Sequence, residues 1–157
     1  MARSPRRRKD RRVREAAPSR YSVETKGEEQ HLTGVLFDSD VIIEILRGRS
    51  KIVDAADALE SSGVPTYCTA ISWAEIYAGI RPGEEHLTEA FFDARGEVVL
   101  DAISGRHAGS YLARYKTSHG LELADALIAA AAVTSDLRLW TLNRRHYPMP
   151  DLSFYEA

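Results

Sequence analysis

The chain has 157 residues, the length of one ordinary domain, so a second full catalytic domain is not expected. Hydrophobic residues make up 44% of the chain and charged residues 28%, which is enough apolar side chain to build one sizeable core. The longest unbroken apolar run, Ala126 to Val133, is far shorter than the ~20 residues of a membrane-spanning helix, so no membrane association is predicted. The single cysteine, Cys68, excludes an internal disulfide and fits a reducing compartment, so we expect a cytoplasmic protein.

Charge is unevenly distributed along the chain, although the formal net charge is only −2. Residues 1–20 hold nine basic and two acidic residues, a net of +7, so residues 21–157 carry −9. An acidic body is not typical of a protein that grips nucleic acid over its whole surface. It suits a body that gathers carboxylates at a metal site or binds a basic partner segment.

The first 34 residues show neither helical nor strand periodicity, and they are predicted to form a basic, disordered tail ahead of a domain at residues 35–157. Three interpretations of the tail stay open. It is a solvated extension, or an arm that contacts RNA phosphates in a salt-dependent way, or translation begins downstream, near Val35. Residues 1–31 are expected to be dispensable for folding.

Strands and helices are predicted to alternate through the rest of the chain. Short apolar runs predict strands at 35–37, 65–69, 97–100 and 138–141. Apolar residues at helical spacing predict helices at 41–46, 51–62, 72–80, 84–95, 104–118 and 124–134. Residues 153–155 could add an edge strand. This alternation predicts an α/β fold with a mainly parallel sheet and helices on both faces.

Acidic residues are predicted to meet at the carboxyl ends of the strands, where open α/β sheets bind their ligands. Asp38 follows the first strand, Glu75 lies one turn into the helix after the second, and Asp125 begins the alanine-rich helix. Gathered carboxylates repel one another unless a cation neutralises them, and all-oxygen ligands select Mg²⁺ or Mn²⁺ over zinc. Such an ion lowers the pKa of bound water and polarises a phosphoryl oxygen, which suits phosphodiester hydrolysis.

Each of these acids also has a structural explanation. Asp38 could cap the helix that follows it. Ser72 is predicted to cap its helix, and with Glu75 three residues later it forms a capping-box pattern. Asp125 lies at a helix N-terminus, where the helix dipole favours a negative charge. The functional hypothesis therefore depends on the three acids together and on no single one.

Neighbouring residues are assigned structural roles. Asp40 and Glu44 are four residues apart and are predicted to form a solvated helix face. Trp73 and Tyr77 are predicted to belong to the core or to an interface. Cys68 is predicted to be a small buried hydrophobic residue.

Four segments, in order along the chain, resemble the motifs of PIN-domain ribonucleases, especially the VapC-type toxins of toxin–antitoxin pairs. These segments are FDSDVIIE at 37–44 with LRG at 46–48, TAISWAEIYAG at 69–79, LADALIAA at 123–130 and LWTLN at 139–143. The resemblance covers residues 35 to about 155, at the family's usual spacings.

The resemblance implies a PIN-like three-layer fold with a central sheet of about five strands, and a Mg²⁺- or Mn²⁺-dependent endoribonuclease that leaves 5′-phosphate and 3′-hydroxyl ends. It implies that Asp38, Glu75 and Asp125 are the catalytic, metal-binding carboxylates, with Ser39 and Thr141 as polar neighbours. It also implies a homodimer, with a small antitoxin protein as its inhibitor.

The chain departs from the family pattern after Thr141. Many members carry a fourth acid two or five residues later, where this chain has Asn143 and His146. Asn143 can still contact phosphate or water, but it has no charge to help hold a second metal. Arg144 and Arg145 are candidates for contact with RNA phosphates.

Two alternative functions stay open. The Asp38-Ser39-Asp40 sequence after a strand also fits the opening of haloacid-dehalogenase-like phosphohydrolases, in which Asp38 would be a nucleophile. The chain lacks a convincing later lysine and paired-acid motif for that family. The second alternative is a non-catalytic module that binds RNA or a partner protein, which the missing fourth acid keeps open.

Overall fold

The computed structural model describes residues 33–157, and the predictions for the basic tail concern residues that lie outside this range. Each helix and strand predicted between residues 35 and 141 is present, with its ends within two residues of the predicted ones. Among residues 33–157, none of the helices has both the length and the apolar character needed to cross a bilayer.

The centre of the described domain is a parallel sheet, in the order β3-β2-β1-β4. Its strands are β1 (Gly34–Phe37), β2 (Thr66–Thr69), β3 (Gly96–Val98) and β4 (Leu137–Trp140). Because every pair is parallel, all of these strands end at the same edge of the sheet.

The sheet has four strands within residues 33–157, whereas about five were expected. The predicted edge strand at 153–155 is reduced to one parallel bridge between Phe154 and Leu139. The Leu139 N–H donates to the Ser153 carbonyl (2.8 Å), and the Tyr155 N–H donates to the Leu139 carbonyl (2.9 Å). The segment therefore covers the open edge of β4 without continuing as a strand.

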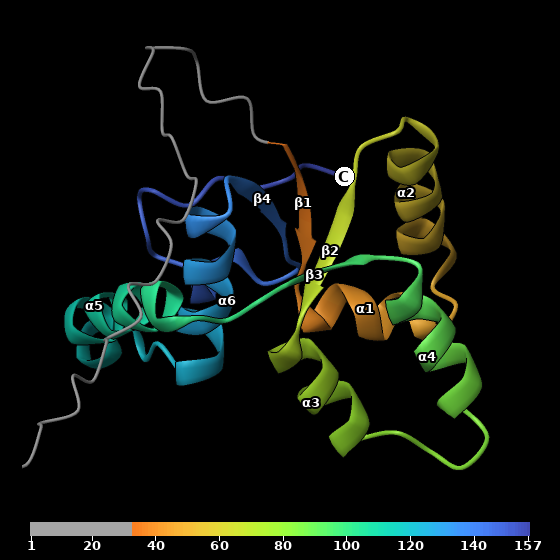
Figure 1. Ribbon diagram of the computed structural model, residues 1–157, viewed down its shortest axis with the longest axis horizontal. Coiled ribbons are helices and arrows are strands. Elements are labelled where there is room, and N and C mark those ends of the chain that lie inside the picture. The colour runs from red at the N-terminus through yellow and green to blue at the C-terminus, as the bar shows by residue number, and fades with distance from the viewer. Residues whose placement is uncertain (1–32) are drawn as a thin grey trace, which may run out of the picture.

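Helices cover both faces of the sheet, as predicted. They are α1 (Ser39–Leu46), α2 (Ser50–Ser61), α3 (Ala70–Ala78), α4 (Glu85–Asp93), α5 (Ala102–His119), α6 (Leu123–Thr134) and the short 3-10 helix η1 (Arg144–His146). Figure 1 shows α1 to α4 on one side of the sheet, and α5 and α6 on the other. The architecture is the predicted three-layer α/β fold.

Alternating side chains of β1 divide the core into two halves. Val35 and Phe37 pack with apolar residues of α1 to α4, while Leu36 packs with those of α5 and α6. All three are fully buried. Trp73 stacks on Phe92 with ring centroids 3.9 Å apart, which confirms its predicted place in the core. β1 is thus an inner strand of the sheet, and packing on both of its faces fixes the residue that follows it.

Candidate active site

The carboxyl edge of the sheet places residues from the two ends of the domain side by side. Phe37 is paired with Trp140 in the sheet, and the Asp38 N–H donates to the Trp140 carbonyl (2.9 Å). Asp38 and Thr141, the next residues on each strand, are both buried. The structure therefore confirms the predicted position of Asp38 at the end of β1.

Both carboxylate oxygens of Asp38 accept hydrogen bonds. The Ser39 backbone N–H donates to Oδ1 (2.7 Å), so Asp38 is also the N-cap of α1. The Tyr147 hydroxyl donates to Oδ2 (2.7 Å). Burial first, and then the nearby charge of Asp38, raise the pKa of Tyr147, so its hydroxyl keeps the proton and acts as the donor. Tyr147 was missed in the sequence, because an aromatic residue in this position resembles any other core residue.

Asp125 lies in the first turn of α6, close to Asp38 and to the turn that contains η1. Burial first, and then repulsion by the charge of Asp38, raise the pKa of Asp125. Nδ1 of His146 lies 3.7 Å from Oδ2 of Asp125, and the Asn143 side-chain amide lies 3.0 Å from the other ring nitrogen of His146. The structure thus brings Asp38 and Asp125 together, with His146 beside Asp125.

Glu75 extends from the second turn of α3, and its predicted capping role is wrong. The helix begins at Ala70, where the Thr69 hydroxyl accepts from the Ser72 N–H (3.4 Å). Ser72 is therefore inside the helix and cannot form a capping box with Glu75. Glu75 is exposed, and its charge contributes to the raised pKa of Asp125, after larger contributions from burial and Asp38. Glu75 therefore lies near enough to the site of Asp38 and Asp125 for its charge to act on Asp125.

Asp40 does not lie on a solvated face, contrary to the prediction. It is half-buried, and its carboxylate accepts from the Leu142 N–H (3.1 and 3.2 Å) and from the Thr141 hydroxyl (3.3 Å). Burial, and then the charge of Asp38, raise the pKa of Asp40 to about 6. Asp40 therefore ties the first turn of α1 to the segment after β4. Glu44 is also half-buried, and its carboxylate pairs with Arg49 (2.9 Å).

The segment after β4 holds the remaining predicted residues. Thr141 Oγ1 accepts from the Asn143 N–H (3.1 Å), and the Arg145 side chain donates to the Asn143 Oδ1 (2.9 Å). Arg144 pairs with Glu156 (2.6 Å). Arg144 and Arg145 are exposed near the site, and their contact with RNA stays a prediction.

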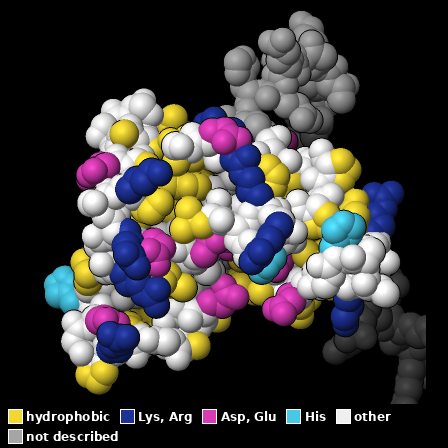
Figure 2. All heavy atoms as spheres, turned by 180° about the vertical axis from the view of Figure 1, so that it is seen from behind, with side chains coloured by type: hydrophobic (Ala, Val, Ile, Leu, Met, Phe, Trp, Pro, Cys, Tyr) yellow, Lys and Arg dark blue, Asp and Glu magenta, His cyan; other side chains and the backbone are white. Residues whose placement is uncertain are grey.

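The side of the molecule opposite to that of Figure 1 carries mixed charges. Figure 2 shows acidic side chains gathered near the middle of this face, with basic side chains on either side of them.

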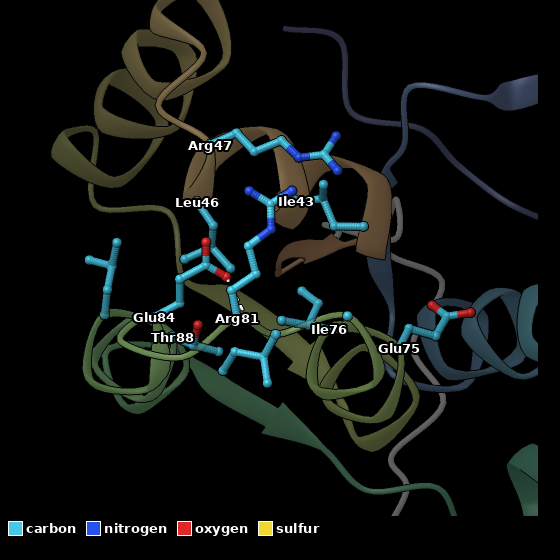
Figure 3. Close-up of a pocket in the computed structure, with 11 residues that line it drawn as sticks. Ile43, Leu46, Arg47, Glu75, Ile76, Arg81, Glu84 and Thr88 are labelled. Carbon is cyan, nitrogen blue, oxygen red and sulfur yellow. Dashed lines mark hydrogen bonds between the residues drawn. The ribbon is translucent and has the colours of Figure 1, made fainter.

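A pocket of about 180 Å³ lies between α1, α3 and the start of α4. Ile43, Leu46 and Ile76 supply apolar lining, and Arg81 extends across the opening (Figure 3). Glu75 lies at the edge of this pocket and points away from its interior (Figure 3).

The donors at the carboxylate site fit a hard divalent cation in their chemistry. Asp38, Asp125 and Glu75 offer oxygen ligands only, and their repulsion is the kind that a cation relieves. Ser39 adds a buried hydroxyl that has no hydrogen-bond partner among residues 33–157. Within the same residues, no three side chains of His, Cys, Asp or Glu are grouped closely enough to enclose a metal ion. The donor chemistry therefore fits a metal, although Asp38, Glu75 and Asp125 do not form a three-carboxylate cluster in the described part of the chain.

Comparisons with known proteins agree with the sequence motifs. Residues 35–152 match the family model described as PIN domain. The chain is 34% identical over 119 residues to Ribonuclease VapC19 of Mycobacterium tuberculosis, across 74% of this chain and 95% of that protein. It is 37% identical over 118 residues to Ribonuclease VapC10 of the same organism, across 73% of this chain and 86% of that protein.

A solved structure shares the fold. VapBC2 from Rickettsia felis, bound to a DNA fragment from its promoter, aligns with a TM-score of 0.66 at 16% identity. The alignment covers 77% of this chain and 96% of that chain. The matched family model extends over the segments that carry Asp38, Glu75 and Asp125. The chain therefore belongs to the PIN-domain family.

Proposed function

We propose that the chain is a metal-dependent endoribonuclease that hydrolyses RNA phosphodiester bonds, and that it is the toxin of a type II toxin–antitoxin pair. The observation that carries the proposal is the meeting of Asp38 and Asp125 at the carboxyl edge of a PIN-domain sheet, where burial and then the charge of Asp38 raise the pKa of Asp125. The names of the relatives, VapC19 and VapC10, describe ribonucleases and support the same activity.

The three acids have distinct parts in this proposal. Asp38 is held rigidly after β1 and would be the fixed ligand of a divalent ion. Asp125 faces it from α6, and Glu75, which is exposed on α3, would complete the ligand set from the solvent side. When bound, Mg²⁺ or Mn²⁺ would lower the pKa of a coordinated water molecule, and its positive charge would offset the negative charge of the phosphate. Ser39 and Thr141 line the site as polar neighbours.

The remaining polar residues would handle substrate. Asn143 and His146 occupy the region where many family members carry a fourth acid, so this chain presents hydrogen-bonding groups there and no additional charge. Arg145 is exposed next to Asn143 and is placed to meet an RNA phosphate. Since the body is acidic, such local basic groups are needed to bring a polyanion to the carboxylates.

The test is cleavage of total cellular RNA by the purified full chain, with Mg²⁺, with Mn²⁺ and with chelator. We expect discrete fragments only in the presence of metal. Asp38→Asn and Asp125→Asn should each reduce cleavage by more than about 100-fold, because the loss of a ligand exceeds the effect of losing an outer hydrogen bond. Asp57→Asn, which makes the same chemical change on an exposed face of α2, should leave cleavage unchanged. Full activity of either site variant would contradict the assignment.

A second candidate function is a non-catalytic module that binds RNA or a partner. Two observations favour it: residues 33–157 contain no group of three carboxylates close enough to enclose a metal ion, and Asn143 is uncharged. It predicts RNA binding that is independent of metal and is not followed by cleavage. Gel-shift measurements with chelator, run beside the cleavage assay, separate the two functions.

The proposed partner is a small antitoxin protein. One solved neighbour is titled a toxin–antitoxin complex, from Klebsiella pneumoniae, which supports such a partner for this chain. The pocket between α1 and α3 offers an apolar lining next to Glu75, so a protein segment bound there would also border the carboxylates.

A cytoplasmic location and a homodimer belong to the same proposal. The exposed side chains of Val99, Ile103 and Leu123 offer apolar surface for self-association.

A further inference from the structure

The carboxylate of Asp38 is held from both sides. Oδ1 accepts from the backbone N–H of Ser39 and Oδ2 accepts from the hydroxyl of Tyr147, each at 2.7 Å. Rotation of the carboxylate about its Cβ–Cγ bond would break both hydrogen bonds. The plane of Asp38 is therefore fixed before any ligand arrives.

Core packing, in turn, fixes Tyr147. Its side chain is only 4% exposed and belongs to the cluster that includes Met149 and Leu152, while its ring lies 6.4 Å from that of Phe154. Its backbone N–H donates to the Arg144 carbonyl (2.9 Å), which closes the turn of η1. Among residues 33–157, Asp38 is the hydrogen-bond partner of this hydroxyl. A buried hydroxyl without such a partner would be costly, so ring packing and the hydrogen bond stabilise the same position.

From this geometry we infer that Tyr147 is a positioning residue, whose hydroxyl holds Asp38 in the orientation that binds a divalent ion. The inference rests on the proposed function. A donor bound to one lone pair of Oδ2 leaves the other lone pairs of the carboxylate to a metal, in a fixed direction. Hydrogen bonds of this kind to a ligating group typically contribute 10–100-fold to metal affinity.

The chain contains a matched control for a purely structural hydroxyl. Tyr111, on α5, is also 4% exposed, and its hydroxyl donates to Oδ2 of Asp151 at the same distance, 2.7 Å. Asp151 also lies beside His107 and takes no part in the carboxylate site. Removing either hydroxyl takes a tyrosine–aspartate hydrogen bond away from a buried tyrosine, but only one of these bonds ends on a proposed ligand.

The experiment measures binding of Mn²⁺ alone, without RNA, to the full chain by calorimetry or by the electron paramagnetic resonance of free Mn²⁺. Circular dichroism verifies that each variant is folded. Tyr147→Phe should raise the Kd for Mn²⁺ by about 10–100-fold, whereas Tyr111→Phe should leave it unchanged. Cleavage of RNA by Tyr147→Phe should recover as Mn²⁺ is raised, which a loss of stability alone would not produce. If Tyr147→Phe is not obtained folded, Tyr147→Met replaces it, since methionine also lacks the hydroxyl.

The outcomes separate the inference from the proposed function. If wild type binds Mn²⁺, Asp38→Asn does not, and Tyr147→Phe binds as tightly as wild type, the positioning role is overturned and the metal site stands. If Tyr147→Phe and Tyr111→Phe weaken Mn²⁺ binding equally, the positioning role is also overturned, because the weaker binding would then follow from a loss of protein stability. If wild type shows no Mn²⁺ binding that depends on Asp38, the proposed metal site and the inference both fail.

Discussion

Replacing Asp40 by Asn should stabilise the metal-free protein at neutral pH. The half-buried carboxylate of Asp40 accepts from the Leu142 N–H and the Thr141 hydroxyl and is repelled by the charge of Asp38. The amide oxygen of Asn can accept from Leu142, and its NH₂ group can donate to the Thr141 hydroxyl. The substitution therefore keeps both links and removes the buried charge.

The pKa of Asp40 gives the size and the sign of the effect. Burial and Asp38 raise this pKa from 3.8 to about 6, so the folded chain binds the proton more tightly than the unfolded chain. The contribution of Asp40 to folding is fully favourable below about pH 4 and is lost as the pH rises through about 6. A hundredfold difference in proton affinity corresponds to about 3 kcal/mol. Because Asp40 is partly exposed, solvent screening reduces the cost of its charge at pH 7.5 to about 1–2 kcal/mol.

The assay is thermal unfolding with chelator present at pH 7.5 and pH 4.5. We expect Asp40→Asn to raise the melting temperature by about 4–8 °C at pH 7.5, and by less at pH 4.5, where the wild-type group is largely protonated. Asp57→Asn, on the exposed face of α2, should show no such pH-dependent gain. An Asp40→Asn protein that is no more stable than wild type at pH 7.5, or whose advantage does not shrink at pH 4.5, would refute this reasoning.

Two further predictions concern stability away from the site. Asp101 caps α5 by accepting from the N–H groups of Ile103 and Ser104, and the hydrogen bond from the Ser104 backbone is the main cause of its lowered pKa. Asp101→Ala should lower the melting temperature at pH 7, and the difference from wild type should vanish as the pH falls through that lowered pKa. Asp101→Asn keeps a hydrogen-bond acceptor, so its melting temperature should fall less. Ile42 is fully buried between α1 and the sheet, so Ile42→Val should cost about 1 kcal/mol in urea unfolding with an unchanged m-value. A loss near zero would mean that the surroundings of Ile42 collapse to fill the space of the missing methyl group.

The regular elements were predictable because their signals are local. A buried strand such as β1 is a short apolar run, and each helix shows its apolar spacing within two or three turns. Asp38 was predictable for the same reason, since the residue after a parallel strand lies at the ligand-binding edge. The start of α3 was misplaced because Thr69 and Ser72 are both good caps, and only the end of β2 at Thr69 decides between them.

The partners of the site residues were not predictable, because they lie far apart in the chain. Asp40 binds the Leu142 N–H across 102 residues, and Tyr147 reaches Asp38 across 109. No local pattern distinguishes Asp40 from an exposed helix acid, or Tyr147 from an ordinary core aromatic. The prediction of an edge strand at 153–155 was wrong for a related reason. The backbone there makes a single bridge to β4, and the sequence carries no signal of where pairing between the two segments stops.

The pairing of β1 with β4 also determines when the site can form during synthesis of the chain. β1 emerges early from the ribosome, but its neighbour β4 and the turn that carries Tyr147 follow about a hundred residues later. At 5–20 residues per second, that interval lasts on the order of 5–20 s. Until it ends, the Asp38 N–H lacks the Trp140 carbonyl and the Asp38 carboxylate lacks the Tyr147 hydroxyl, and α6 with Asp125 has only just appeared. The carboxylate site of the proposed nuclease is therefore complete only after β4 and the turn that carries Tyr147 have been synthesised.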